Sequence, residues 1–154
     1  MTTHQHAATG FQTGHIGLNV SNVASSKEFY QHVFGLEVVR ESQEAGRTFA
    51  LLGHDGQAVI TLWQQSSGKF SKDVPGLHHL AFRVETMEEV QAVETKLRAL
   101  KAHFLYDGIV PHAEGTQSGG IFFEDPDGIR LEVFTPHGAE DLKAPSAAPS
   151  CGFF

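Results

Sequence analysis

Hydrophobic and polar positions follow their clearest pattern between residues 119 and 134. Two runs rich in Ile, Phe and Val flank Asp125-Pro126-Asp127-Gly128, in which the proline presets one backbone angle and the glycine tolerates a positive φ. This pattern predicts a β-hairpin. In its second strand, Ile, Leu and Val alternate with Arg130, Glu132 and Phe134, so the two sets face opposite sides. A glutamate in mid-strand needs a cationic partner, either an arginine or a metal.

The first half of the chain predicts one helix among four strands. Residues 13–20 alternate between apolar and polar and are expected to form a strand. A helix is expected over 25–33, capped by Ser21 or Asn22 and ended by Gly35. Its buried side is expected to carry Phe29, Tyr30 and Val33. Three more strands are predicted over 36–41, 47–52 and 57–64, the last two joined as a hairpin.

The second half repeats this order after a polar stretch at 65–76. A strand is predicted over 77–84, and a helix follows from its cap at Thr86 to about residue 101. Apolar residues recur along this helix at helical spacing, at Val90, Val93, Leu97 and Leu100. A strand is predicted over 104–110, and the hairpin supplies the last two strands. The chain is therefore an internal repeat of strand, helix and three strands.

The repeat places particular residues at equivalent positions. His15 opens the first strand of the first half, and His79 holds the matching place 64 residues later. Glu132 corresponds to Thr61, which lies 71 residues earlier. Two like modules about a pseudo-twofold axis would bring His15, His79 and Glu132 together, with Thr61 as the fourth member. Two imidazoles and one carboxylate with open positions suit Fe(II) and other divalent metals, which act as Lewis acids.

Composition limits the class of partner. The chain has 154 residues, a net charge of −7 and one cysteine. An acidic chain without a basic cluster argues against nucleic acid and anionic membrane as partners. A single cysteine excludes an internal disulfide and a cysteine zinc site. No apolar run reaches membrane-spanning length and no secretory pattern opens the chain, so we expect a cytoplasmic protein.

These observations divide the chain into five segments. We expect a mobile N-terminus over 1–12, a first βαβββ module over 13–64 and a linker over 65–76. A second βαβββ module follows over 77–136, and a C-terminal tail covers 137–154. His4 and His6 in the N-terminus are expected to be solvated. His112 and His137 lie in loops with Pro and Gly and are likewise expected to be solvated.

The sequence resembles the vicinal oxygen chelate superfamily, which includes glyoxalase I, extradiol dioxygenases and fosfomycin- and bleomycin-resistance proteins. The resemblance covers about residues 14–135. It rests on Gly14-His15-Ile16-Gly17-Leu18, the stretch 25–36, His79-Leu80-Ala81-Phe82, and Asp125-Pro126-Asp127-Gly128 followed by Leu131-Glu132. It implies an α+β fold in which two βαβββ modules form a curved mixed sheet around a metal-containing funnel. It also assigns His15, His79 and Glu132 as the metal ligands.

Departures from the family pattern narrow the expected activity. Thr61 stands where glyoxalase I has a glutamate that is ligand and base, which argues against ordinary glyoxalase I activity. Phe122 stands where extradiol dioxygenases have a tyrosine, and their upstream base histidine is replaced by Trp63, Gln64 and Gln65. Both features argue against ring cleavage. What remains is a three-ligand site in an apolar funnel, whose mouth His112 could reach as an alternative to being solvated.

Two classes of function follow. The first is a metal-dependent lyase, isomerase or dioxygenase that binds a small substrate through vicinal oxygens, with one divalent ion of Fe, Mn, Ni, Co or Zn per site. The second is a bleomycin-resistance-like binding protein without catalysis. The substrate is expected to contact Asn19, Thr61, Trp63 and Phe122, which share faces with the ligands or line the funnel. We also expect a homodimer, since apolar strands at module edges need cover. The site forms either within one chain or across a swapped dimer.

The tail leaves two interpretations open. Residues 144–150 form a Pro/Ala/Ser spacer that cannot build a core, and the sequence then reads Cys151-Gly152-Phe153-Phe154. A disordered end is one interpretation. The other is that the two phenylalanines dock on an apolar groove at the funnel mouth or the dimer seam and cover part of the site.

Overall fold

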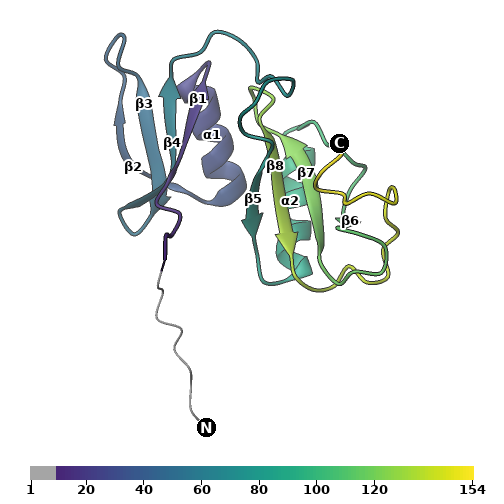
Figure 1. Ribbon diagram of the computed structural model, residues 1–154. Coiled ribbons are helices and arrows are strands. Elements are labelled where there is room, and N and C mark those ends of the chain that lie inside the picture. Colours follow the sequence, from purple (N-terminus) through teal and green to yellow (C-terminus); the bar gives the residue numbers. More distant parts are fainter. Residues whose placement is uncertain (1–9) are drawn as a thin grey trace.

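The computed structural model describes residues 10–154, which form two modules of strands and one helix each (Figure 1). The first module contains β1 (Ile16–Val20), α1 (Val23–Phe34), β2 (Glu37–Ser42), β3 (Phe49–His54) and β4 (Gln57–Gln64). The second contains β5 (Leu80–Arg83), α2 (Met87–Ala99), β6 (Val110–Pro111), β7 (Gly119–Glu124) and β8 (Arg130–Thr135). The predicted α+β fold of two repeated modules is confirmed. His4 and His6 lie outside the described residues.

The strands form two separate four-stranded mixed sheets rather than one continuous curved sheet. Their orders are β1-β4-β3-β2 and β5-β8-β7-β6, with β1 parallel to β4 and β5 parallel to β8. The register confirms the predicted equivalence of the modules, because Gly17 pairs with Thr61 as Ala81 pairs with Glu132. The strands that follow His15 and His79 are both edge strands of their sheets.

Each helix covers one face of its own sheet. Helix α1 contacts β3 and β4, and α2 contacts β7 and β8. The first turn of α1 is capped by Asn22, whose side chain accepts from the Ser25 amide, and the helix ends at Gly35 with φ of 66°. Thr86 and Glu89 form a capping box at the start of α2. Neither helix in residues 10–154 is long and apolar enough to cross a membrane.

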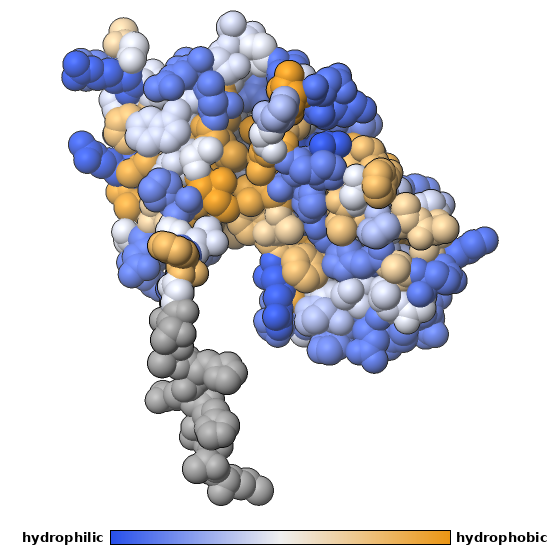
Figure 2. Space-filling model, viewed as in Figure 1, coloured by the Kyte–Doolittle hydropathy of each residue, from blue (hydrophilic) through white to orange (hydrophobic). Residues whose placement is uncertain are grey.

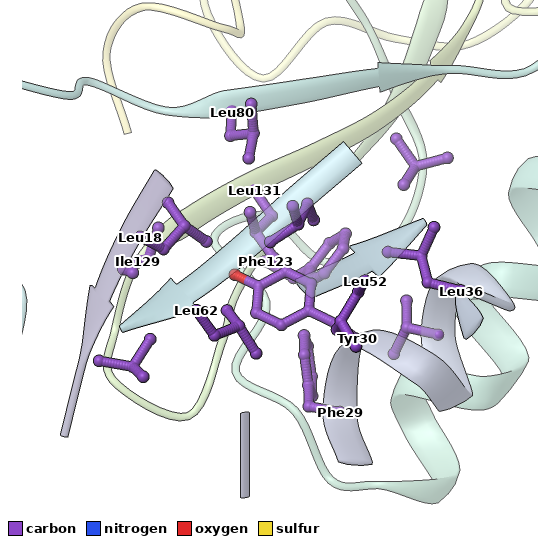
Figure 3. Close-up of a cluster of buried hydrophobic side chains, with 14 of the residues drawn as sticks. Leu18, Phe29, Tyr30, Leu36, Leu52, Leu62, Leu80, Phe123, Ile129 and Leu131 are labelled. Carbon is purple, nitrogen blue, oxygen red and sulfur yellow. The ribbon is translucent and has the colours of Figure 1, made fainter. Parts of the chain in front are cut away.

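One hydrophobic core joins the two modules. Leu18, Tyr30 and Leu62 of the first module lie with Leu80, Phe123 and Leu131 of the second in the close-up of Figure 3. Along each strand, the core residues alternate with residues that point to the opposite face of the sheet. That opposite face is therefore left for other contacts.

Polar bonds from the turn before β8 also cross between the modules. The Tyr30 hydroxyl donates to the Asp125 carboxylate over 2.9 Å, and the amide and hydroxyl of Ser21 donate to Asp127. Asp125 also accepts from the amides of Asp127 and Ile129. The turn therefore both closes the β7–β8 hairpin and fixes the second module against the start of α1.

Two local predictions are wrong. The strand predicted over 104–110 is reduced to Val110–Pro111, with an isolated bridge between Phe104 and Phe123. Gly108 has φ of 86°, which interrupts extended pairing at that point. Leu100 is 44 % exposed rather than buried, because α2 ends at Ala99 and the chain turns through Lys101 with φ of 54°.

Candidate metal centre

Glu132 lies at the centre of a buried polar cluster on the face of the second sheet that α2 does not cover. It lies in the middle of β8, where it pairs with Ala81 of β5 on one side and Phe122 of β7 on the other. Its side chain is 3 % exposed. Its Oε2 lies 3.2 Å from His79 Nε2, and its Oε1 lies 2.5 Å from His112 Nε2. The structure therefore gives the mid-strand glutamate two imidazole neighbours, one from the edge of β5 and one from the end of β6.

We infer the tautomer of His79 from the hydrogen bonds of its neighbour, His78. His78 Nε2 lies 3.1 Å from the Gly152 carbonyl oxygen, which only accepts, so this nitrogen carries the proton. When Nε2 carries the only ring proton of His78, its Nδ1 accepts, and the facing Nδ1 of His79, 2.8 Å away, is the donor. His79 Nε2 is therefore left with a lone pair.

That lone pair faces Glu132 Oε2, so two acceptors lie 3.2 Å apart. Such a pair repels unless a cation lies between them, either a proton or a metal ion. Burial lowers the pKa of His79, which outweighs the opposing pull of the Glu132 carboxylate and favours the neutral ring. A neutral imidazole nitrogen and a carboxylate oxygen are donors that divalent transition metals accept, so the pair fits part of a metal site.

His112 is not the solvated loop residue that its sequence context suggested. Its side chain is 22 % exposed, and its Nδ1 lies 2.8 Å from the Ser118 hydroxyl. With the Ser118 hydroxyl donating to Nδ1, His112 Nε2–H donates to Glu132 Oε1. His112 therefore holds one carboxylate oxygen and leaves the other for His79. His137, the other loop histidine, is exposed and lies 3.2 Å from Gln117 Oε1.

The first module carries its candidate residues on its own sheet. His15 is exposed and precedes β1, and Asn19 is exposed and accepts from the Gln65 amide. Thr61 is 3 % exposed, and its hydroxyl accepts from Trp63 Nε1 over 3.0 Å. Trp63 is itself 37 % exposed and packs against Phe49 at 5.3 Å between ring centroids. This face thus presents one imidazole, two polar groups and an aromatic surface.

The structure brings together two of the three predicted ligands, His79 and Glu132. In residues 10–154, no group of three or more His, Cys, Asp or Glu side chains is arranged to hold a metal ion. His15 stays with the first module, at the head of a different sheet. A complete set of the three residues therefore requires a donor from beyond this arrangement of one chain.

Aromatic side chains surround the His79–Glu132 pair. Phe122, predicted to contact substrate, is fully buried beside Glu132 in the sheet. Its ring lies 5.4 Å from Tyr106 and 5.4 Å from Phe154. Phe154 also lies 5.8 Å from the His79 ring. The expected apolar lining is present, but the tail supplies part of it.

Arg130 is a site residue that the sequence analysis placed on the right face without giving it a role. It precedes Glu132 by two residues and is 7 % exposed. Its Nε donates to the His78 carbonyl oxygen over 2.9 Å, and its Nη1 donates to the main-chain oxygen of Phe154 over 3.2 Å. Among the ion pairs of the described residues it has no acidic partner. A buried guanidinium bonded only to main-chain oxygens has donors to spare.

The tail is docked through Phe154, whereas Phe153, which the second interpretation also expected to dock, is 77 % exposed. Ser150 is fully buried; its amide donates to the His112 carbonyl oxygen and its hydroxyl to that of Pro111. The Tyr106 hydroxyl donates to the Ser150 carbonyl oxygen over 2.8 Å. These bonds cover the edge at β6 and carry residues 151–154 to the His79–Glu132 pair.

A cavity of about 620 Å³ lies elsewhere, between α1 and the loop after α2. It contains a second histidine–glutamate pair, in which His103 Nδ1 lies 3.0 Å from Glu124 Oε2. The His103 side chain is 69 % exposed, so water solvates this pair, unlike His79 and Glu132. It offers an internal comparison for tests of the buried pair.

Comparisons with known proteins identify a family and several relatives. The model of the glyoxalase/bleomycin resistance protein/dioxygenase superfamily matches residues 12–133. YaeR of Escherichia coli, an uncharacterized protein, is 32 % identical over 133 residues, which cover 80 % of this chain and 95 % of that protein. A trivalent organoarsenical cleaving enzyme of a Bacillus species is 29 % identical over 78 % of this chain and 70 % of the enzyme.

Solved structures show the same fold. A glyoxylase/bleomycin resistance protein/dioxygenase domain from Frankia superposes with a TM-score of 0.70 at 24 % identity, over 84 % of this chain and all of that domain. The fosfomycin resistance protein FosX from Listeria monocytogenes superposes with a TM-score of 0.62 at 22 % identity, over 84 % of this chain and 93 % of FosX.

Proposed function

Because this chain belongs to the glyoxalase/bleomycin resistance protein/dioxygenase superfamily, we propose that it is a metal-dependent enzyme whose small substrate binds through two neighbouring oxygens. One divalent ion, of Fe, Mn, Ni, Co or Zn, is held by His15, His79 and Glu132. The reaction is of the lyase, isomerase or dioxygenase type. A FosX variant of the same fold was crystallised with Mn(II) and a dihydroxypropylphosphonic acid whose hydroxyls are on adjacent carbons, which fits this class of ligand.

The observation that carries the proposal is the opposition of His79 Nε2 and Glu132 Oε2. In the tautomer inferred for His79 both atoms are acceptors; they lie 3.2 Å apart, and the carboxylate is 3 % exposed. A cation relieves the repulsion between them. His78 and His112 hold the two outer atoms of the pair, which orients both donors toward the same point.

The third donor is proposed to come from a second copy of the chain. β1 and β5 are edge strands, so β1 of one copy can lie beside β5 of another and join two four-stranded sheets into one. That pairing brings His15 of one copy to the face that carries His79 and Glu132 of the other. Figure 2 shows hydrophobic side chains reaching the surface between the two modules, near these strands. The homodimer is thus proposed together with the site.

The residues of the chain give such a site specific tasks. The metal, when bound, supplies a Lewis acid that stabilises negative charge on substrate oxygen. His112 orients the Glu132 carboxylate by donating to Oε1. Phe122 and Tyr106 exclude water on one side, and the Thr61 hydroxyl offers a hydrogen bond but no base at neutral pH.

Metal content of purified protein tests the proposal. His79→Ala removes one of three protein donors and is expected to lower metal occupancy at least about tenfold relative to wild type. His103→Ala disrupts the exposed pair with Glu124 and is the matched control, with wild-type occupancy expected. Full stoichiometric metal in His79→Ala would contradict the site. Wild-type protein that binds small aromatic compounds but takes up no metal would favour the alternative, a binding protein without catalysis.

A further inference from the structure

The ring of Phe154 occupies a subsite beside the metal-ligand pair. Its neighbours are aromatic or cationic: the ring lies 5.4 Å from Phe122, 6.1 Å from Tyr106 and 5.5 Å from His78 between centroids. The Arg130 guanidinium carbon lies 4.9 Å from the centre of the same ring. Arg130 also donates to the main-chain oxygen of Phe154. The subsite therefore recognises an aromatic ring and an oxygen acceptor attached close to it.

The arrangement leaves no access to the carboxylate. Glu132 is 3 % exposed, and Phe122, His79 and Phe154 form one continuous set of ring contacts over it. A substrate that chelates a metal on Glu132 needs open coordination positions beside that oxygen. Phe154 must leave before such a substrate can enter.

The tail is built with a fixed base and a lightly held tip. Ser150 is fully buried and makes three hydrogen bonds to Tyr106, Pro111 and His112. Beyond it, the tail is held by single hydrogen bonds from His78 to Gly152 and from Arg130 to Phe154, together with the ring contacts of Phe154. Phe153 is 77 % exposed and adds little. Residues 151–154 can therefore swing away while Ser150 stays in place.

We propose that Phe154 is an internal competitor for the substrate subsite, and that the substrate is a small aromatic compound with oxygen acceptors next to its ring. This inference rests on the proposed function for the role of the metal, but the ring subsite itself needs no metal. The tail then regulates access: an aromatic ligand displaces Phe154 and takes over its contacts with Phe122, Tyr106 and Arg130. Ligands without a ring gain nothing from the exchange.

Binding to metal-free protein tests the competition directly. Phenylglyoxylate, which has two neighbouring oxygen functions beside a ring, is titrated by calorimetry in the presence of chelator, and pyruvate is the ring-free comparison. If Phe154 fills the subsite about nine-tenths of the time, Phe154→Ala binds phenylglyoxylate about tenfold more tightly than wild type. Phe153→Ala alters the adjacent, exposed ring and is expected to match wild type. Pyruvate affinity is expected to be the same in all three proteins.

Two further measurements distinguish a Phe154 that the ligand displaces from a Phe154 that stays in place as part of the pocket lining. In wild type, phenylglyoxylate is expected to speed amide hydrogen exchange at residues 152–154 but not at Ser150. In the Phe154→Ala background, Arg130→Gln is expected to lower phenylglyoxylate affinity about tenfold. Equal or weaker phenylglyoxylate binding by Phe154→Ala, or slower exchange at 152–154 on binding, would overturn the proposal. Loss of metal binding alone would overturn the proposed function and leave this result standing.

Discussion

A heterodimer of two variants, each lacking a different proposed ligand, tests whether the three proposed ligands come from one chain or from two. His79 and Glu132 lie together in the second module, whereas exposed His15 heads β1 of the first. In a shared dimer, each site takes the first module of one chain and the second module of the other. A His15→Ala chain and a His79→Ala chain are then each defective alone, because both homodimers lack one ligand at every site.

A heterodimer of these two variants restores one site. The site built from the intact first module of the His79→Ala chain and the intact second module of the His15→Ala chain has all three ligands. The other site lacks both histidines. We therefore expect about one metal ion per heterodimer, against about two for the wild-type dimer and near zero for either homodimer. If the ligands met within one chain, every chain of the heterodimer would carry a defect and no site would be restored.

The assay needs two affinity tags and a metal determination. The two variants are co-expressed with different tags, the doubly tagged dimer is purified, and its metal content is measured by mass spectrometry. The matched control pairs His79→Ala with Glu132→Gln, since both defects are in the second module and neither site is restored in a shared dimer. Metal in the His15/His79 heterodimer no higher than in this control would refute shared ligands. A purely monomeric wild type by light scattering would do the same.

Three more predictions test the neighbouring structure. Thr61→Glu is expected to add a fourth donor, tighten metal binding and suppress native turnover; unchanged affinity and turnover would place residue 61 out of reach of the metal. Tyr30→Phe leaves the buried Asp125 carboxyl without one donor, so urea unfolding is expected to give a stability lower by about 1–3 kcal/mol. Burial raises the pKa of Asp125 above its ordinary 3.8, so its stabilising contribution is full below that pH and is lost as pH rises through the folded-state pKa. The stability of wild type relative to Asp125→Asn should therefore fall as pH rises above 3.8, and a flat difference would contradict the assignment.

Periodicity predicted most of the fold because each element has a buried face of its own. The alternation in β4 predicted its bounds, 57–64, without error, and the buried helical positions Phe29, Tyr30 and Val33 are confirmed. The prediction of a strand over 104–110 was wrong because the apolar residues there belong to a loop, which pairs with β7 only at single points. Sequence pattern also left open whether the modules share one sheet, because edge-to-edge pairing of strands leaves no periodic signal.

Residues of the candidate site were predictable only where strand register identified them. His79 and Glu132 follow from the match between the modules, and the pairing of Ala81 with Glu132 and Gly17 with Thr61 bears out that match. His112 was missed because it follows a two-residue strand in a loop that has no alternation. Its contact with Glu132 spans 20 residues and depends on how that loop folds back onto β7. The sequence interpretation allowed His112, but not His137, to reach the funnel mouth, and it predicted no contact with Glu132.

The proposed dimer contact, the proposed metal site and the docked tail all lie at one face of the second sheet. His15 of a partner must approach His79 and Glu132 at the edge formed by β5, and Phe154 lies against the same His79 ring. Events that use one face are thermodynamically linked, so a metal ion or ligand that favours the open face also favours whichever dimer supplies the third donor. A tail that competes with substrate therefore opposes the metal-loaded dimer as well. By the same linkage, Phe154→Ala is expected to lower the dimer dissociation constant in metal-loaded protein, as measured by sedimentation at several concentrations, whereas Phe153→Ala leaves it unchanged. Equal dissociation constants for all three proteins would show that the tail and the partner occupy separate parts of this face.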